Sequence, residues 1–222
     1  MARTLTFLHT SPGHIATFDA LLAETGEEVS ARHIVRESLL REARARGITP
    51  QLQRRVAETV LAAFEGAGGV LVCTCSTIGA CAEATGNQHS RPVIRLDRPM
   101  AERAVELGSR ILVVGTLAPA IASTHELVLE VARRAGKKIA VTELMCGAAW
   151  KRYEEGDQAG YLQLVADAVC EAAAEVDVVV LAQASIADAA DLCAEVSTPI
   201  LSSPRLGVEA ALAALEHAEQ AA

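Results

Sequence analysis

Aromatic residues are scarce in this chain, and clusters of basic residues are missing. Phenylalanine, tryptophan and tyrosine make up 3% of the 222 residues, and the formal net charge is −8 at pH 7. Proteins that bind nucleic acids or anionic membranes gain affinity from clustered lysine and arginine. The composition therefore argues against a nucleic acid or a membrane as the partner of this protein.

Long apolar runs are missing as well. None approaches the roughly 20 residues that a membrane-spanning helix requires. The first residues, Met1–Leu8, are typical of a short strand rather than of a signal peptide. We therefore expect a cytoplasmic protein, and we expect its six cysteines to be free thiols rather than a disulfide framework.

The chain also has few residues of the kinds that hold common cofactors. Its lysines are Lys137, Lys138 and Lys151, and none of them lies in a turn after a strand. Cys73 and Cys75 form a CxC pair, but no second close pair of Cys or His completes a tetrahedral metal site. We therefore expect no pyridoxal phosphate, no metal and no other cofactor.

What the chain does contain is a regular alternation of apolar runs with amphipathic helical stretches. Apolar residues make up 51% of the sequence, and most are Ala, Val and Leu, which suit close packing of helices on a parallel sheet. The runs predicted to be strands are Thr4–His9, Gly69–Thr74, Pro92–Leu96, Ile111–Gly115, Ile139–Leu144, Val176–Leu181 and Pro199–Leu201. This alternation predicts an α/β fold with parallel sheets and helices on both faces.

One helix start is clear in the sequence. Thr49 places a capping hydroxyl before Pro50, a residue favoured at the first position of a helix. Val56, Val60 and Phe64 then recur at helical spacing, so we expect them on one face. The glycine-rich segment 66–69 is predicted to end this helix.

The second half of the chain repeats the pattern of the first. A strand, a proline and a helix follow one another at Arg91–Met100 and again at Thr198–Leu206. The turn His9–Gly13 has its counterpart at Gly115–Pro119, and the turn after the cysteine strand has one at Leu181–Ser185. A duplication would give two halves related by a pseudo-twofold axis, with four strand-end turns around one cleft. The alternative is the general likeness of all parallel α/β units.

The segment Gly69–Gly79 carries the strongest chemical signal. An apolar run ends in a thiol, Cys75, followed by two hydroxyls and a predicted helix from Ile78 to Ala84. A thiol at the start of a helix faces free N–H groups and the positive end of the helix dipole, and both favour the thiolate. Cys75 is therefore predicted to be the most reactive thiol, with a pKa below that of a free cysteine. The alternative is a small, packed apolar residue at a strand end.

These motifs, in this order, resemble the aspartate/glutamate/hydantoin racemase superfamily, which includes maleate isomerase and arylmalonate decarboxylase. Cys75-Ser76-Thr77 looks like the first catalytic Cys-Asn-Thr of that family. The other similar segments are the turn Thr10–Gly13, the strand end Val114–Thr116, the second cysteine motif at Asp177–Ser185 and the stretch His33–Leu40. The resemblance extends over essentially the whole chain.

The resemblance implies two flavodoxin-like domains, residues 1–97 with 206–222 and residues 98–205, with the active site in the cleft between them. It also implies cofactor-independent proton transfer at the carbon α to the carboxylate of a small carboxylate or dicarboxylate. Cys75 is then the catalytic base, and an enediolate must be stabilised by nearby donors. The residues expected to bind substrate are Thr10, Ser11, Ser76, Thr77, Thr116, Gln183, Ala184 and Ser185. Each hydroxyl has the alternative of only capping a helix or turn.

The chain departs from the family at Gln183, which stands where racemases of this group carry a second catalytic Cys. Racemisation by two bases needs an acid or base on each face of the planar intermediate, and an amide cannot move a proton at neutral pH. Three interpretations stay open. In the first, Cys75 works alone, in a stereospecific decarboxylation, an isomerisation or a tautomerisation.

In the second interpretation another residue replaces the missing thiol, and Cys146, His9 and His14 are the candidates for this second base. In the third, the protein binds small carboxylates without catalysis. Selectivity is expected to depend on loops such as Gly147–Glu154, where Trp150 and Tyr153 supply aromatic surface. The sequence leaves the oligomeric state open, a homo-oligomer included.

Overall fold

The computed structural model describes residues 3–65 and 69–220, which fold into two compact α/β units. The first unit joins the chain up to Leu96 to the residues from Pro204 onward, and the second runs from Asp97 to Ser203. Each unit contains a four-stranded sheet in which every pair of neighbouring strands is parallel. The predicted α/β class, with two flavodoxin-like units, is confirmed.

The sheet of the first unit has the order β2-β1-β3-β4. Its strands are β1 (Thr4–His9), β2 (Ser30–Val35), β3 (Val70–Cys73) and β4 (Val93–Arg95). Its helices are α1 (His14–Thr25), α2 (Glu37–Arg46), α3 (Pro50–Ala63), α4 (Ser76–Gln88) and α9 (Ser203–Gln220).

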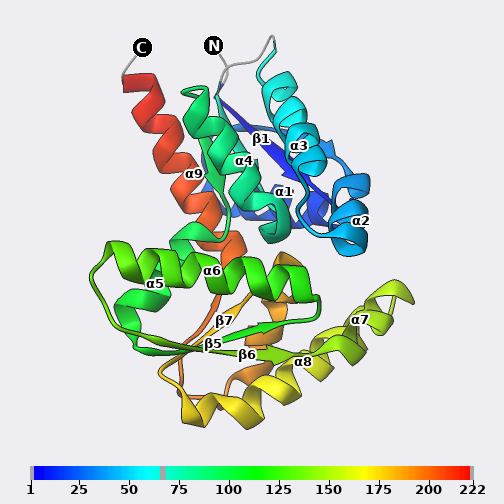
Figure 1. Ribbon diagram of the computed structural model, residues 1–222, viewed down its shortest axis with the longest axis vertical. Coiled ribbons are helices and arrows are strands. Elements are labelled where there is room, and N and C mark those ends of the chain that lie inside the picture. The colour runs from blue at the N-terminus through cyan, green and yellow to red at the C-terminus, as the bar shows by residue number, and fades with distance from the viewer. Residues whose placement is uncertain (1–2, 66–68, 221–222) are drawn as a thin grey trace. The chain divides into compact units, whose positions relative to one another are not determined.

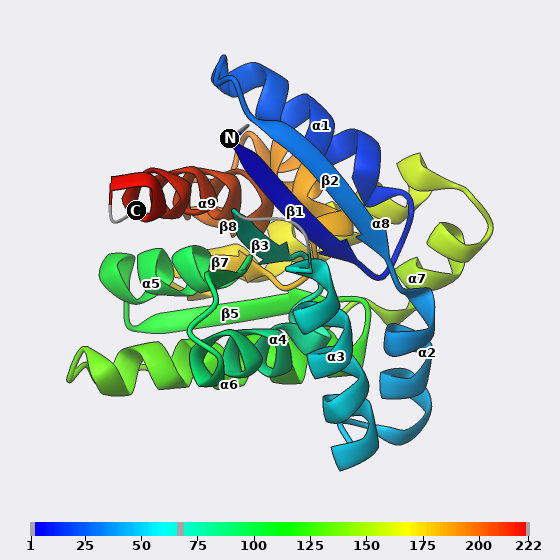
Figure 2. The ribbon, with the colours of Figure 1, turned by 90° about the horizontal axis from the view of Figure 1, so that it is seen from above.

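The core of the first unit lies on both faces of this sheet because successive residues of a strand point to opposite sides. Leu8 and Leu71 pack with Val56 of α3 and Ile78 of α4 in one buried apolar cluster. On the other face, the ring of Phe7 lies 5.1 Å from that of Phe18 in α1, measured between centroids. Figures 1 and 2 show α3 and α4 on one side of the sheet and α1 on the other.

The sheet of the second unit has the order β6-β5-β7-β8, which repeats the order of the first. Its strands are β5 (Arg110–Gly115), β6 (Ala140–Met145), β7 (Val178–Leu181) and β8 (Ile200–Ser202). Its helices are α5 (Arg98–Leu107), α6 (Ala118–Arg134), α7 (Gly147–Glu154), α8 (Gln158–Ala172) and the 3₁₀ segments η1 (Ala173–Glu175) and η2 (Ala184–Cys193).

The second core is likewise divided by its sheet. Leu112 and Val114 of β5 pack with Tyr161 and Val165 of α8, whereas Val113 between them packs with Ile121 of α6. Figure 1 shows α6 and α8 on opposite sides of β5 and β7. No helix in the described part of the chain is long and apolar enough to cross a membrane.

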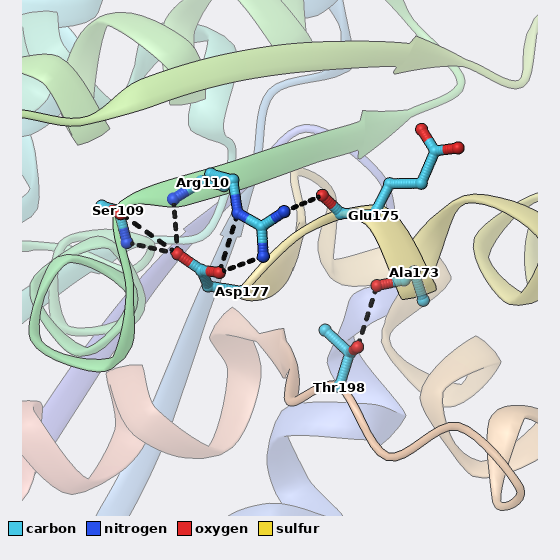
Figure 3. Close-up of polar contacts among 6 residues, drawn as sticks. All are labelled: Ser109, Arg110, Ala173, Glu175, Asp177 and Thr198. Carbon is cyan, nitrogen blue, oxygen red and sulfur yellow. Dashed lines mark hydrogen bonds and ion pairs between the residues drawn. The ribbon is translucent and has the colours of Figure 1, made fainter.

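The amino ends of β5 and β7 are joined by the side chain of Asp177 (Figure 3). Its carboxylate accepts hydrogen bonds from the backbone N–H groups of Ser109 and Arg110, at 2.9 and 2.8 Å, and from the Arg110 guanidinium. These donors hold the pKa of Asp177 well below its usual range. Asp177 therefore joins two strands at the sheet end opposite the turn that carries Gln183.

The strand runs predicted from the sequence are found within two residues at each end, but β2 was not among them. Its residues Ser30-Ala31-Arg32 are exposed, because β2 is an edge strand. The helix start at Thr49 is confirmed, since the Thr49 hydroxyl accepts a hydrogen bond of 3.2 Å from the N–H of Leu52. The predicted helix end in segment 66–69 lies largely outside the described residues.

The prediction of a loop over Gly147–Glu154 is wrong, because this segment is helix α7. Trp150 and Tyr153 are not a free aromatic surface. Their rings stack at a centroid distance of 4.8 Å, and both are partly buried against the core of the second unit. The two aromatic side chains therefore serve to pack against the core rather than to form a solvent-exposed surface.

Candidate active site

The strand registers align the turns of the two units residue by residue. Leu8 of β1 pairs with Cys73 of β3, and Val114 of β5 pairs with Leu181 of β7. Two residues further on in each unit, Cys75 and Gln183 therefore occupy equivalent positions at the carboxyl ends of equivalent strands. The same count makes Thr10 equivalent to Thr116 and His9 equivalent to Gly115.

Cys75 is the residue that immediately precedes α4, and it is buried. Its sulfur receives hydrogen bonds from the hydroxyls of Thr10 and Thr77 and from the backbone N–H groups of Thr77 and Ile78. Thr10 reaches it from the turn after β1, so two neighbouring strand ends meet at this thiol. Three of the predicted site residues, Thr10, Cys75 and Thr77, are thus brought together.

Burial raises the pKa of the Cys75 thiol above its ordinary value, because the loss of hydration outweighs the four hydrogen bonds that lower it. The prediction of a lowered pKa is therefore wrong. The helix start supplies the expected hydrogen-bond donors. Desolvation of the thiol nevertheless changes its pKa more than these donors do. At neutral pH the resting group is a thiol, and the donors are in place to stabilise the thiolate once it forms.

Ser11 and Ser76 lie beside this cluster. Ser76 is the first residue of α4 and is partly buried. The Ser11 hydroxyl accepts a hydrogen bond of 3.3 Å from the N–H of Gly13 and so shapes the turn before α1. Ser11 therefore has at least one structural role.

In the second unit the equivalent position is filled by an amide whose oxygen is fully engaged. Gln183 Oε1 accepts hydrogen bonds from the N–H of Thr116 at 2.6 Å, the hydroxyl of Thr116 at 3.1 Å and the N–H of Leu117 at 3.2 Å. The hydrogen-bond donors of the turn after β5 are thus already paired with another residue of the protein. Gln183 neither gives nor takes a proton in this arrangement.

A buried tyrosine connects the other hydroxyls of this turn. The Tyr161 hydroxyl lies 3.3 Å from Thr116 Oγ1 and 2.8 Å from Ser185 Oγ, and the ring is fully buried. Burial raises the pKa of Tyr161, so this hydroxyl stays protonated. Ala184 begins η2 between Gln183 and Ser185 and contributes no polar side chain.

Cys146 lies at the carboxyl end of β6, immediately before α7. It packs against the apolar core of the second unit, and burial raises the pKa of its thiol. Its strand register makes it equivalent to Arg36, which follows β2 in the first unit.

The two histidines considered as bases differ in their surroundings. His9 is fully buried, and both of its ring nitrogens lie 2.8 Å from a partner, Thr74 Oγ1 and His33 Nδ1. His14 has a buried Nδ1 that finds no hydrogen-bond partner in the described part of the chain. Burial lowers the pKa of His9 to about 3 and that of His14 to about 4, so both are neutral at pH 7.

Sequence reasoning missed several polar residues of these turns, namely Thr74, His33, Asp19 and Tyr161. A signal for Tyr161 was present, because a phenolic hydroxyl in an apolar helix needs a buried partner. His33 was singled out only as the start of the stretch His33–Leu40 in the resemblance, without a role, and its strand was not predicted. Among the described residues, no group of three or more His, Cys, Asp or Glu side chains is arranged to hold a metal ion.

No protein-family model matches this sequence, and no curated protein matches it. Solved structures do match over nearly the whole chain. The glutamate racemase of Francisella tularensis in complex with D-glutamate superimposes with a TM-score of 0.71 at 16% identity, covering 98% of this chain and 82% of that one.

The aspartate racemase of Picrophilus torridus gives a TM-score of 0.69 at 12% identity, covering 98% of this chain and 94% of the other. A variant of arylmalonate decarboxylase gives 0.63 at 14% identity, covering 96% and 93%. At such identities the likeness shows the fold alone, and the fold is that of the aspartate and glutamate racemases.

Proposed function

We propose that this chain is an enzyme of the aspartate/glutamate racemase superfamily that transfers a proton at the carbon α to a carboxylate, with Cys75 as the base. The observation that carries the proposal is the set of donors around Cys75. Two hydroxyls and two backbone N–H groups converge on its sulfur at the start of α4. Such donors stabilise a thiolate, which is the form of cysteine that removes a proton.

The raised pKa of Cys75 fits this role. A base becomes stronger as its pKa rises, and a proton α to a carboxylate is difficult to remove. The cost is that only a small fraction of the thiol is ionised at pH 7. We therefore expect the rate to rise with pH through the neutral range and to level off only above the ordinary pKa of a thiol.

The equivalent position in the second unit favours chemistry with a single base. Gln183 carries no group that acts as an acid or a base near neutral pH, and its oxygen accepts hydrogen bonds from Thr116 and Leu117. We propose that the product is protonated from one side by Cys75, in a reaction that needs no cofactor. The substrate class is a small mono- or dicarboxylate.

Decarboxylation is a second candidate, favoured by the same absence of a base at position 183. Loss of CO₂ from a malonate-type substrate leaves an enediolate without any proton removal, and one acid then completes the reaction. The Cys75 thiol, protonated at rest, is suited to that single delivery. The fold shared with arylmalonate decarboxylase is compatible with this chemistry.

Proton exchange in heavy water tests the proposal. Wild-type protein is incubated with a panel of small carboxylates, amino acids and malonates, and the loss of the α-proton signal, or of CO₂, is followed by NMR. Cys75→Ala should lower the rate about 10²- to 10⁴-fold, the usual contribution of a positioned acid or base. Cys81→Ala, which removes a half-buried thiol from α4, the helix that Cys75 precedes, is the matched control and should leave the rate unchanged.

The other interpretations predict different results. A second base at Cys146 or His14 would make Cys146→Ala or His14→Gln as damaging as Cys75→Ala. A protein that only binds carboxylates would show thermal stabilisation by a ligand without any exchange. Full activity in Cys75→Ala would disprove the proposed role of this residue.

A further inference from the structure

A continuous line of hydrogen bonds runs from an exposed carboxylate to the turn that carries Cys75. Asp19 Oδ1 on α1 lies 2.9 Å from His33 Nε2, His33 Nδ1 lies 2.8 Å from His9 Nε2, and His9 Nδ1 lies 2.8 Å from Thr74 Oγ1. Thr74 is the residue before Cys75. The side chain of Asp19 is 54% exposed and that of His33 is 14% exposed, whereas His9 is fully buried.

We propose that Asp19, His33, His9 and Thr74 form a relay that transmits the protonation state of His33 to the hydroxyl of Thr74, the residue before Cys75 in the chain. The relay does not depend on the proposed reaction. It follows from which atoms can donate and which can only accept. The Asp19 carboxylate only accepts, so His33 Nε2 carries a hydrogen.

The first arrangement of protons has the Thr74 hydroxyl donating to the carbonyl oxygen of Leu8, 3.1 Å away. His9 Nδ1 must then donate to Thr74, and the bare His9 Nε2 must accept from His33 Nδ1. His33 therefore carries hydrogens on both nitrogens and is an imidazolium, paired with Asp19.

The second arrangement follows when His33 loses one proton. Its Nδ1 becomes an acceptor, His9 must donate from Nε2, and His9 Nδ1 is left bare. The Thr74 hydroxyl then turns from Leu8 to donate to His9. This turn is inexpensive, because the Leu8 carbonyl keeps its hydrogen bond of 3.1 Å from the Thr74 N–H.

His9 stays neutral in both arrangements, and only the position of its proton changes. Burial holds the pKa of His9 at about 3, so the ring does not take up a second proton near neutrality. Its aromatic neighbours Phe7 and Phe18 lie at centroid distances of 5.9 and 5.6 Å and help to keep it dry.

The charged and titratable groups that face the relay are few among the described residues. Asp19 and His14 come from α1 and His9 comes from β1, while the turn after β3 contributes only the neutral Thr74. On β2 itself, the Arg32 guanidinium donates to the carbonyl oxygen of Ala63 rather than to His33. Among these groups, His33 is the one that contacts both Asp19 and His9.

Nitrogen NMR of the histidine rings tests the relay directly. The protein is labelled with ¹⁵N, and long-range proton–nitrogen spectra are recorded between pH 5 and pH 9. We expect His9 to keep one protonated nitrogen throughout, and that nitrogen to change from Nδ1 to Nε2 as His33 loses its proton. A His9 ring that keeps one tautomer, or that becomes charged in this range, overturns the proposal.

Substitutions at the two ends of the line, Asp19 and Thr74, distinguish a relay from a set of hydrogen bonds that is merely structural. Asp19→Asn should move the tautomer change of His9 to lower pH by about one unit, because the imidazolium loses its counter-charge. Asp188→Asn, at an exposed position on η2, should not move it. Thr74→Val should abolish the change and fix His9 with its hydrogen on Nε2, while Thr74→Ser should restore it.

The effect on Cys75 is read from the rate of its alkylation by iodoacetamide against pH. The wild type and Thr74→Ser should show an inflection at the pH where His9 changes tautomer, and Thr74→Val should lack it. If the tautomer changes but the alkylation rate shows no inflection, transmission to Cys75 is refuted. Because the readout is alkylation, failure of the proposed catalytic function leaves this test intact.

Discussion

Cys75 and Gln183 lie two residues beyond the ends of equivalent strands, but the groups around them are arranged for different occupants. Four donors surround the Cys75 sulfur, and a proton leaving this thiol leaves a charge that they stabilise. Three donors bind Gln183 Oε1. This amide oxygen is a neutral acceptor, and it keeps the three donors permanently hydrogen-bonded. At this scale the difference between the two units is one between a group that titrates and one that does not.

Replacing Gln183 by Cys should change the stereochemistry of the proposed reaction. Wild-type protein is expected to give a product of one hand with one deuterium from heavy water. Gln183→Cys supplies a thiol at the position equivalent to Cys75, and it should raise racemisation about 10²-fold or more above wild type. Chiral chromatography of the product measures the ratio of enantiomers.

Gln183→Ser is the matched control, because it also removes the amide but cannot act as an acid or base. Both variants leave the N–H groups of Thr116 and Leu117 without their present acceptor, and each should lose about 1–3 kcal/mol of stability. Racemisation by the wild type that disappears in Cys146→Ala would instead favour a second thiol at Cys146. Equal racemisation by both Gln183 variants would contradict the role given to the new thiol.

The roles of individual residues were only partly predictable. The sequence placed Cys75 at a strand end before a helix because the apolar run and the hydroxyl residues are local features. The direction of its pKa shift was mispredicted because burial depends on the packing of distant segments. The hydrogen bonds of Gln183 join residues more than sixty positions apart, and no local pattern encodes them.

Helix α3 begins with a cap that can be removed without touching the core. The Thr49 hydroxyl accepts from the N–H of Leu52, and Pro50 follows at the first helical position. Thr49→Ala should lower the free energy of unfolding by about 1 kcal/mol, measured by urea denaturation. Thr49→Ser keeps the acceptor and should recover most of the loss. If both variants are equally unstable, the cap does not account for the effect.

Among the strands of the two sheets, the central ones and the edge strands β4, β6 and β8 were predicted, and the edge strand β2 was not. The run Val70–Cys73 is fully buried and wholly apolar, which is the pattern that a central parallel strand requires. The outer strand β2 exposes Ser30, Ala31 and Arg32, so its sequence looks like a loop. The role of His33, the relay residue on β2, was not predicted for the same reason.

Taken as a whole, the protein should be sensitive to mild acid. Burial lowers the pKa of His9 to about 3 and of His14 to about 4, below the 6.5 of an unfolded histidine. Between these values the unfolded chain binds more protons than the folded one, so the free energy of unfolding falls as the pH drops below 6.5. We expect a loss on the order of 5 kcal/mol by pH 4.5, about half of it from each histidine.

Urea denaturation at several pH values measures this dependence. His14→Gln removes one of the two groups and should flatten the acid limb, whereas His217→Gln, at an exposed position on α9, should not. An identical pH dependence in all three proteins would mean that other groups cause the loss.

The repeated architecture was visible in the sequence because the same order of strand, proline and helix, with similar turns, recurs in both halves. The strand order of the second sheet repeats that of the first, as the recurrence of Arg91–Met100 at Thr198–Leu206 suggested. The sequence pattern did not show how far the equivalent turns differ from each other. His9 in one turn and Gly115 in the other share no property that a pattern search detects.

Gly115 leaves room for two neighbours at once. A Cβ at this position would lie 2.7 Å from Ile121 Cγ1 and 3.2 Å from Gln183 Oε1, so any side chain at 115 would press on Ile121 of α6 and on the amide. A histidine at 115, matching His9 at the equivalent position, therefore cannot be introduced by a single substitution, because both Ile121 and Gln183 would have to give way.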